Sequence, residues 1–278
     1  MIIAVMTVVL IALFGIQIFC IAPNRGREER LRPYRETYIA HRGLFDHEKA
    51  PENSMPAFRR AVEQGYGIEL DVQLTADGKA VVFHDESLNR VCGVDRLVRD
   101  CTYAELQQYL LEHSAERIPL FREVLDMVAG SVPIVVEIKS EGGFERTVPI
   151  VAALLDDYKG EYCIESFHPL AVAWFRKYRP DVLRGQLATG FFRSWFSSGN
   201  PLAKFLSSNL LLNFRSKPDF IAYNRACQYQ PSFLLCKWLF PVVTIAWTVR
   251  SPRELASARK HFHGIIFDSF IPDDSKTG

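Results

Sequence analysis

The stretch "GIELDVQLTADGKAVVFH" at residues 67–84 decides the fold and starts the functional argument. Apolar and polar residues alternate through 67–75, which predicts a strand, and an Ala-Asp-Gly turn leads to a second strand at 79–84. Glu69 and Asp71 are two positions apart, so a strand points both side chains to the same face. Two buried carboxylates side by side repel each other, and a bound cation would neutralise them.

Segments of this kind recur along the chain, separated by stretches with helical patterning. The eight principal strands begin near residues 37, 67, 133, 161, 182, 219, 242 and 264. Their connections are long enough for crossover helices, so neighbouring strands are expected to be parallel. Eight strand–helix units predict an α/β fold of the TIM (β/α)8 barrel type, with a doubly wound open sheet as the alternative.

In a TIM barrel the active site lies at the carboxyl ends of the strands, and polar residues of this chain gather there. The set placed late in a predicted strand, or just after it, is His41, Glu69, Asp71, Glu137, Lys139, Trp247 and Asp268. Glu137 repeats the arrangement of the first stretch, because its apolar neighbours Val136 and Ile138 face the other way. Three converging carboxylates favour one divalent cation with oxygen ligands, Mg²⁺ or Ca²⁺.

Two histidines and two cationic side chains accompany the carboxylates. His41 and His84 are a candidate acid/base pair, because imidazole titrates near neutral pH. Arg42 and Lys139 are donors suited to a phosphate group. The combination favours phosphoryl chemistry, and the lack of a glycine-rich nucleotide loop argues against a nucleoside triphosphate substrate. The net charge of +1 gives no reason to expect a nucleic acid partner.

The chain resembles the glycerophosphodiester phosphodiesterase family, of the membrane-anchored bacterial type, in the run HRG…PENSMPAF…GIELDVQLTADGKAVVFHDESLNR at 41–90. Later segments agree in the same order, with VEIKS at 136–140, WTV at 247–249 and GIIFD at 264–268. The resemblance implies a TIM barrel with a small insertion after the second principal strand, at about residues 85–118.

The resemblance also implies a reaction and a set of residue roles. The implied roles are metal ligands for Glu69, Asp71 and Glu137, an acid/base pair for His41 and His84, and substrate contacts for Arg42, Lys139 and Trp247. The implied reaction is metal-dependent hydrolysis of glycerophosphodiesters to glycerol 3-phosphate and an alcohol. Two positions depart from the family pattern, since Arg250 stands where asparagine is usual and Phe267 where threonine is common.

Residues 1–22 contain no charged side chain and, as a helix, are long enough to cross a hydrocarbon core of about 30 Å. A cleaved signal peptide is the alternative, but no Lys or Arg precedes the apolar run and Pro23 stands where cleavage would be expected. Five arginines at 25–35 flank only the C-terminal side, which predicts a single-pass cell-membrane protein with a cytoplasmic catalytic domain. The predicted division is a transmembrane anchor at 1–22, a basic linker at 23–36 and the barrel domain at 37–278.

A second candidate membrane contact is the segment 191–217, which mixes four basic residues with Phe, Trp and Leu and has no acidic residue. Such a composition suits an anionic membrane surface, and an ordinary barrel helix followed by a loop is the alternative. As a membrane contact, the segment would bring the active site close to lipid. The enzyme would then also accept lysophospholipids, with lysophosphatidate as the product.

Two other functions stand beside hydrolysis. A phospholipase D-like barrel enzyme would form a cyclic phosphate, and the VEIKS context together with the insertion favours hydrolysis over this alternative. A catalytically silent, membrane-anchored binding module would be expected to have lost a metal ligand or a histidine. This chain keeps all of them.

Overall fold

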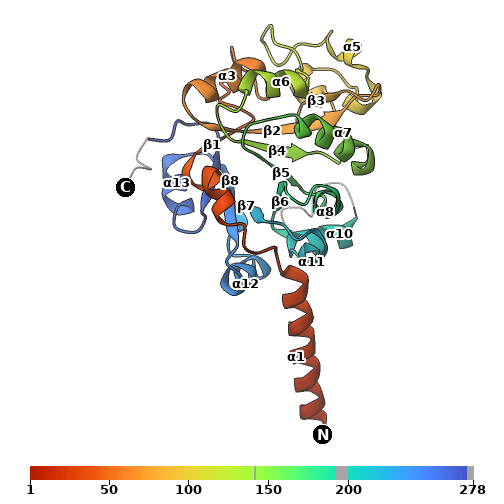
Figure 1. The fold of residues 1–278 in the computed structure, drawn as a ribbon, viewed down its shortest axis with the longest axis vertical. Helices are drawn as coiled ribbons and strands as arrows, with labels where there is room; N and C mark the ends of the chain where they lie inside the picture. Colours follow the sequence, from red (N-terminus) through yellow and green to blue (C-terminus); the bar gives the residue numbers. More distant parts are fainter. Residues whose placement is uncertain (141, 192–199, 274–278) are drawn as a thin grey trace.

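The structure is a computed structural model that describes residues 1–140, 142–191 and 200–273 (Figure 1). Eight parallel strands form a closed barrel: β1 (Ile39–His41), β2 (Gly67–Leu74), β4 (Ile134–Ile138), β5 (Tyr162–Ser166), β6 (Leu183–Ala188), β7 (Phe220–Asn224), β8 (Val243–Val249) and β9 (Gly264–Phe267). The barrel closes because β1 pairs with both β2 and β9. The predicted TIM barrel is confirmed, and the open sheet is excluded, because an open sheet would leave β1 with a free edge.

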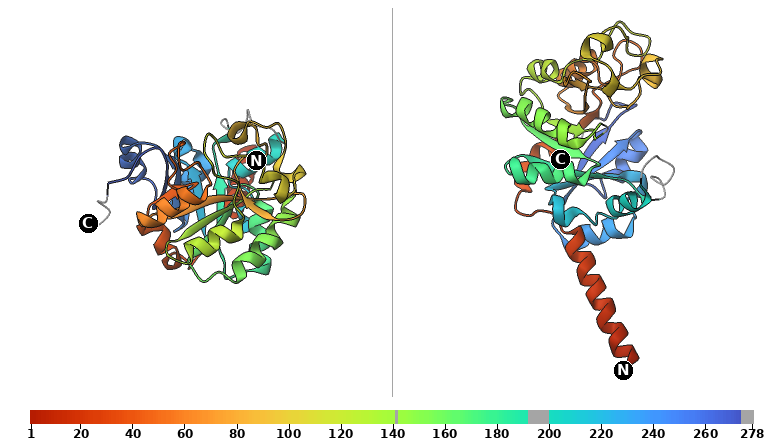
Figure 2. Two further views of the ribbon diagram at one scale, coloured as in Figure 1. Left: turned by 90° about the horizontal axis from the view of Figure 1, so that it is seen from above. Right: turned by 90° about the vertical axis from the view of Figure 1, so that its right-hand side faces the viewer.

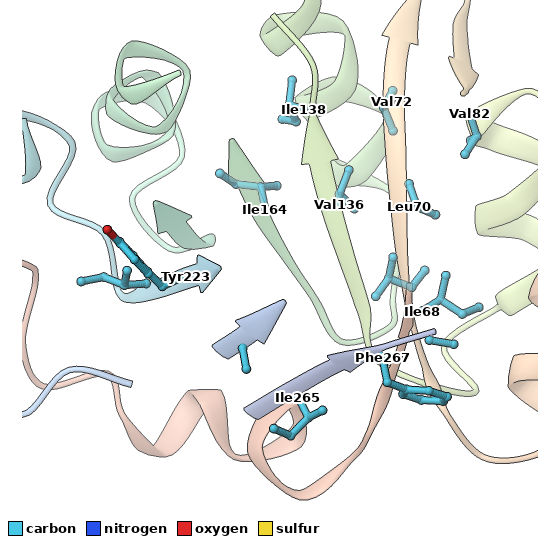
Figure 3. Close-up of a cluster of buried hydrophobic side chains, with 14 of the residues drawn as sticks. Ile68, Leu70, Val72, Val82, Val136, Ile138, Ile164, Tyr223, Ile265 and Phe267 are labelled. Atoms are coloured by element: carbon cyan, nitrogen blue, oxygen red, sulfur yellow. The ribbon is translucent and has the colours of Figure 1, made fainter. Parts of the chain in front are cut away.

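Helices cover the outside of the barrel. They are α3 (Met55–Glu63), α6 (Phe121–Val128), α7 (Phe144–Asp156), α8 (Pro169–Tyr178), α10 (Pro201–Ser208), α11 (Asn213–Ser216), α12 (Pro231–Leu239) and α13 (Pro252–Ala258), with the short turn η3 (Arg225–Cys227) after β7. Figure 3 shows side chains from one face of β2, β4 and β5, among them Leu70, Val136 and Ile164, in the buried layer between strands and helices. The alternation of the strands therefore turns Glu69, Asp71 and Glu137 to the opposite face, inside the barrel.

The insertion after the second principal strand forms a small unit with its own core. It contains β3 (Ala80–Val82), which pairs antiparallel with β2, followed by α4 (Asn89–Cys92), η2 (Val98–Asp100) and α5 (Tyr103–Leu106). The pattern Thr102-x-x-Glu105 predicts a helix that continues to about residue 112, and the capping box of these two residues begins α5. The helix ends at Leu106 instead of continuing to about residue 112, because the chain turns back and the Gln107 side chain donates to the Ile118 carbonyl.

Residues 23–36, which the sequence predicts to be a basic linker, close the amino end of the barrel. This segment forms η1 (Glu29–Leu31) and α2 (Arg32–Glu36), and both Leu31 and Tyr34 are completely buried in the inner core of the barrel. The Arg27 guanidinium lies 3.2 Å from the Asp219 carboxylate, just before β7. The segment therefore packs against the barrel. It can do so because the apolar residues Leu31 and Tyr34 stand among its charged residues.

Leu31→Ala is expected to lower the free energy of unfolding by about 2–5 kcal/mol, because it leaves a cavity in the inner core of the barrel. The change should be measured by thermal and denaturant unfolding of the full-length protein in detergent. Leu110→Ala is the matched control, since Leu110 is 43% exposed in the insertion. We expect the control to stay within about 0.5 kcal/mol of the wild type. Equal effects of the two changes would contradict a structural role for the segment at 23–36.

Helix α1 (Ile2–Ile21) extends away from the barrel (Figure 1; Figure 2). It is the one helix among the described residues that is long and apolar enough to cross a membrane, a property that signal sequences share. Its last turn packs on the barrel, where Ile21 is buried and the Phe19 ring lies 5.3 Å from the Phe214 ring.

Candidate active site

The three carboxylates predicted to bind metal come together at the carboxyl end of the barrel. Glu69 and Asp71 lie on β2, and Asp71 is in register with Glu137 on the neighbouring strand β4. One oxygen from each of the three side chains lies within 4.8 Å of the others, and all three residues are buried. Such a set of converging buried carboxylate oxygens is a suitable site for a divalent cation.

The charges of this cluster are unbalanced within the protein. Lys139 Nζ lies 2.8 Å from Asp71 Oδ1 and 2.7 Å from Glu137 Oε1, so a single ammonium serves two carboxylates. Burial alone would lower the pKa of Lys139, but the two carboxylates outweigh burial and raise it. Burial and the neighbouring carboxylates raise the pKa of Glu69 well above its usual value. An additional cation at the cluster would relieve this repulsion, so the residues fit a metal ion.

Local backbone geometry aims the carboxylates. Arg42 and Asn53 both have a φ of 57°, in the left-handed region, which sharply turns the loop after β1. The turn lets the Arg42 backbone N–H donate to Glu69 (3.1 Å) and the buried Asn53 amide donate to Asp71 (2.8 Å). Ser54 then caps α3 by accepting a hydrogen bond from the Ala57 N–H. The loop between β1 and α3, at residues 42–54, therefore positions the Glu69 and Asp71 carboxylates.

His41 is held in one tautomer beside the cluster. Its Nδ1 lies 2.8 Å from the Asp268 carboxylate, and its Nε2 lies 4.0 Å from Glu69. Burial lowers the pKa of His41, and the hydrogen bond with Asp268 opposes this shift without cancelling it. The imidazole is therefore neutral near pH 7, with the proton on Nδ1 and Nε2 free to accept a proton.

His84 also lines the cavity, and the carboxylate of Asp85 binds it. Its Nδ1 is 2.5 Å from Asp85, and Arg90 holds Asp85 with a 2.6 Å ion pair. Arg90 also binds Glu52, which in turn binds the Arg42 guanidinium at 2.8 Å. Glu52 therefore orients the Arg42 guanidinium.

These side chains share one open cavity of about 220 Å³. Its lining includes His41, Arg42, Glu69, His84, Glu137, Glu165, Phe167, Trp247 and Arg250. The Trp247 ring lies edge-on to Phe167 with 5.6 Å between ring centres, and its Nε1 has no hydrogen-bond partner among the described residues. The site residues predicted from the sequence thus line this cavity, except that Asp71 and Lys139 belong to the carboxylate cluster next to it and Asp268 is bound to His41.

Glu165 and Phe167 are two lining residues that the sequence reasoning did not single out. Glu165 is in register with Glu137 and is 1% exposed, and its Oε2 has no hydrogen-bond partner among the described residues. Burial and the nearby carboxylates raise the pKa of Glu165 well above its usual value. The position of Glu165 in the sequence could have indicated a place in the site, because it stands one residue before the end of its strand, as Glu137 does.

Asp268→Asn is expected to lower kcat by about 10–100-fold, the usual cost of losing an outer partner that orients a functional histidine. The amide can present its N–H to His41 Nδ1, which would move the imidazole proton to Nε2 and block its use as a base. Ser269→Ala is the control, because Ser269 donates to the other Asp268 oxygen at 2.8 Å. Steady-state kinetics of both variants checks this, and a wild-type kcat for Asp268→Asn would contradict the orienting role.

Comparisons with known proteins give consistent matches over the barrel. The model of the glycerophosphoryl diester phosphodiesterase family matches residues 41–271. A glycerophosphodiester phosphodiesterase from Bacillus altitudinis is 38% identical over 156 residues, which cover 52% of this chain and 63% of that protein. A human lysophospholipase D is 34% identical over 130 residues, which cover 42% of this chain and 40% of that protein. The chain thus spans less than two thirds of the length of either relative.

Solved structures share the fold. A phosphodiesterase from Oleispira antarctica, solved in complex with the product sn-glycerol 3-phosphate, superposes with a TM-score of 0.66. The two chains are 22% identical, and the match covers 84% of this chain and 92% of that one. At this identity the likeness concerns the fold, and it agrees with the closed barrel described above.

Proposed function

We propose, because the chain belongs to the glycerophosphoryl diester phosphodiesterase family, that it hydrolyses glycerophosphodiesters to glycerol 3-phosphate and an alcohol with one divalent cation. The observation that carries the proposal is the meeting of three buried carboxylates, two carboxylate-bound histidines and Arg42 around one cavity. The relative from Bacillus altitudinis supports this substrate class.

The cation would be held by Glu69, Asp71 and Glu137, and it would supply positive charge where the phosphate gains negative charge. Arg42 and Lys139 are proposed to add to this field at the phosphate oxygens. The unpartnered Trp247 N–H is proposed to donate to an oxygen of the bound substrate.

His41 and His84 are proposed to divide the proton transfers. His41 Nε2 takes a proton from the attacking water while the water oxygen forms a bond to phosphorus. His84, with Nδ1 engaged by Asp85, gives a proton to the alcohol oxygen as its bond to phosphorus breaks. At the end of the reaction His41 has gained a proton and His84 has lost one. Proton exchange with solvent returns both histidines to their starting states.

Product analysis tests this proposal. The full-length protein, freed of metal and then supplied with Mg²⁺ or Ca²⁺, is incubated with glycerophosphocholine or glycerophosphoethanolamine in ¹⁸O-labelled water. We expect phosphorus NMR to show glycerol 3-phosphate that carries ¹⁸O from the first turnover. A persistent cyclic phosphate would favour the phospholipase D-like alternative, and binding without any product would favour the silent binding module.

Lysophospholipids are the second proposed substrate class. The relative that is a human lysophospholipase D supports it, as does the apolar helix α1 that leaves the barrel. The assay is the same panel with lysophosphatidylcholine in vesicles, read by mass spectrometry for lysophosphatidate.

The proposed topology is a retained membrane anchor at 1–22 with the barrel domain at 37–278 in the cytoplasm. The buried Ile21 side chain and the hydrogen bond that its carbonyl accepts from Asn213 support a helix that stays with the barrel after synthesis. The arginines that follow the helix support the orientation. Mass spectrometry of the purified chain tests retention, and protease protection in spheroplasts tests the orientation.

A further inference from the structure

Helix α1 joins the barrel beside α11 and α12, on its flank (Figure 1). Its last carbonyl, that of Ile21, accepts hydrogen bonds from the Asn213 amide on α11 (3.1 Å) and the Cys236 thiol on α12 (3.5 Å). Lys217 Nζ donates to the next carbonyl, that of Ala22, at 3.1 Å. These contacts from two helices fix the direction in which α1 leaves the barrel.

Helices α10 and α12, which both contact α1, expose large apolar side chains. On α10, Leu202 is 64% exposed and Phe205 is 45% exposed. On α12, Leu234 is 42% exposed and Trp238 is 79% exposed. We call these four residues the collar of α1. Soluble proteins rarely gather such side chains at one place without a partner.

The depth of the collar follows from the groove beside α1. Phe205 and Leu206 line an apolar groove of about 500 Å³ together with Leu13 and Ile16 of α1. Phe205 therefore lies beside the carboxyl-terminal half of the helix proposed to cross the membrane. Ile16 lies five residues, about 7.5 Å along the helix, before Ile21, so a bilayer around the whole of α1 would have Phe205 in its boundary region, where aromatic side chains are favourable.

The charge of this part of the barrel fits an anionic lipid surface. Residues 182–253 contain a single acidic residue, Asp219, whose side chain is buried and paired with Arg27. The same region carries Lys204 on α10 and Arg215 on α11. Basic side chains interleaved with Leu, Phe and Trp are the composition of segments that rest on anionic membranes.

We infer that the flank formed by α10, α11 and α12 rests on an anionic bilayer through the collar, so that the barrel lies on its side. The inference deepens the proposed function, because it takes α1 as the membrane anchor and names the lipid surface as partner. The collar also reaches the catalytic mouth, since the Phe205 ring is 5.7 Å from Phe191, three residues after the end of β6. Lipid would therefore meet the β6 edge of the mouth.

The sequence predicts a candidate membrane contact at 191–217, and the structure describes only part of this segment. Residues 192–199 lie outside the described part of the chain, Leu210 is buried, and Phe214 packs on Phe19 of α1. Leu234 and Trp238 are exposed on α12, a helix distant in sequence that contacts α1 through Cys236, and Phe205 on α10 lies in the groove beside α1.

Photocrosslinking of the full-length protein in nanodiscs tests the collar. Benzoylphenylalanine replaces Phe205 or Trp238, with Phe14 in α1 as the anchor position and the 43% exposed Leu110 of the insertion as the control. The nanodiscs contain phosphatidylcholine and phosphatidylglycerol at a 3:1 ratio. We expect lipid adducts at positions 14, 205 and 238 at yields at least about fivefold above position 110, since only these would touch the bilayer.

Two other outcomes would contradict the inference. Adducts at position 14 without adducts at 205 and 238 would overturn the collar and leave the anchor intact. No adduct at position 14 would overturn the proposed anchor and the collar together.

A kinetic test asks whether the collar serves catalysis on lipid. The double variant Phe205→Ser/Trp238→Ser should lose at least about fivefold in the rate on vesicle-bound lysophosphatidylglycerol, because interfacial aromatic contacts hold the mouth at the surface. Its rate on soluble glycerophosphoglycerol should match the wild type, as should both rates of Leu110→Ser. Equal losses on both substrates would assign the two residues to barrel structure and overturn the inference, as would no loss on either.

Discussion

His41→Ala is expected to lower kcat by about 10²–10⁴-fold, the usual cost of removing a positioned acid or base. The imidazole is held by Asp268 at Nδ1, which leaves Nε2 as a proton acceptor beside the carboxylate cluster. His84→Ala should have a loss of the same order, because it removes the proton donor for the leaving alcohol.

Both histidine variants should stay folded and keep the metal. Neither residue belongs to the carboxylate set, so calorimetric titration with Mg²⁺ or Ca²⁺ should give wild-type stoichiometry. Wild-type turnover in either variant would refute its assignment as acid or base. Loss of metal together with activity would show instead that the histidine acts through the cluster.

Glu137→Gln should weaken binding of the divalent cation by more than about 100-fold. Loss of an outer partner of a metal ligand costs about 10–100-fold in metal affinity, and loss of a direct ligand should cost more. The substitution removes one negative charge from the oxygen set and leaves Lys139 with Asp71 alone. Glu69→Gln and Asp71→Asn should act in the same direction. Thorough treatment with EDTA should abolish the wild-type activity, and added Mg²⁺ or Ca²⁺ should restore it.

Glu165→Gln is the matched control for the metal prediction. It is the same chemical change at the neighbouring register position of the barrel, but Glu165 is outside the three-residue set. Titration calorimetry should find wild-type metal stoichiometry in this variant. Full activity of the wild type after chelation, or equal loss of metal in Glu165→Gln and Glu137→Gln, would contradict the assignment of the three ligands.

The sequence by itself determined the elements that local chemistry controls. Alternation in 67–75 and 133–140 set the strands and the inward face of Glu69, Asp71 and Glu137, because side chains in a strand alternate with a period of two. The capping pattern at Thr102 set the beginning of α5. The number of strand–helix units predicted the barrel, because parallel neighbours need crossover connections and eight such units close on themselves.

Only the tertiary structure decided which distant residues meet. Asp268 reaches His41 because β1 pairs with β9, at the closure of the barrel, and Glu165 joins the cavity because β5 lies beside β4. The segment at 23–36 has the composition of a linker, yet Leu31 is buried because the open amino end of the barrel needs an apolar cover. Helix α1 likewise contacts both α10 and α12, which lie far from it in the chain. Burial and strand pairing of this kind depend on closing the whole barrel, and no local pattern of residues encodes them.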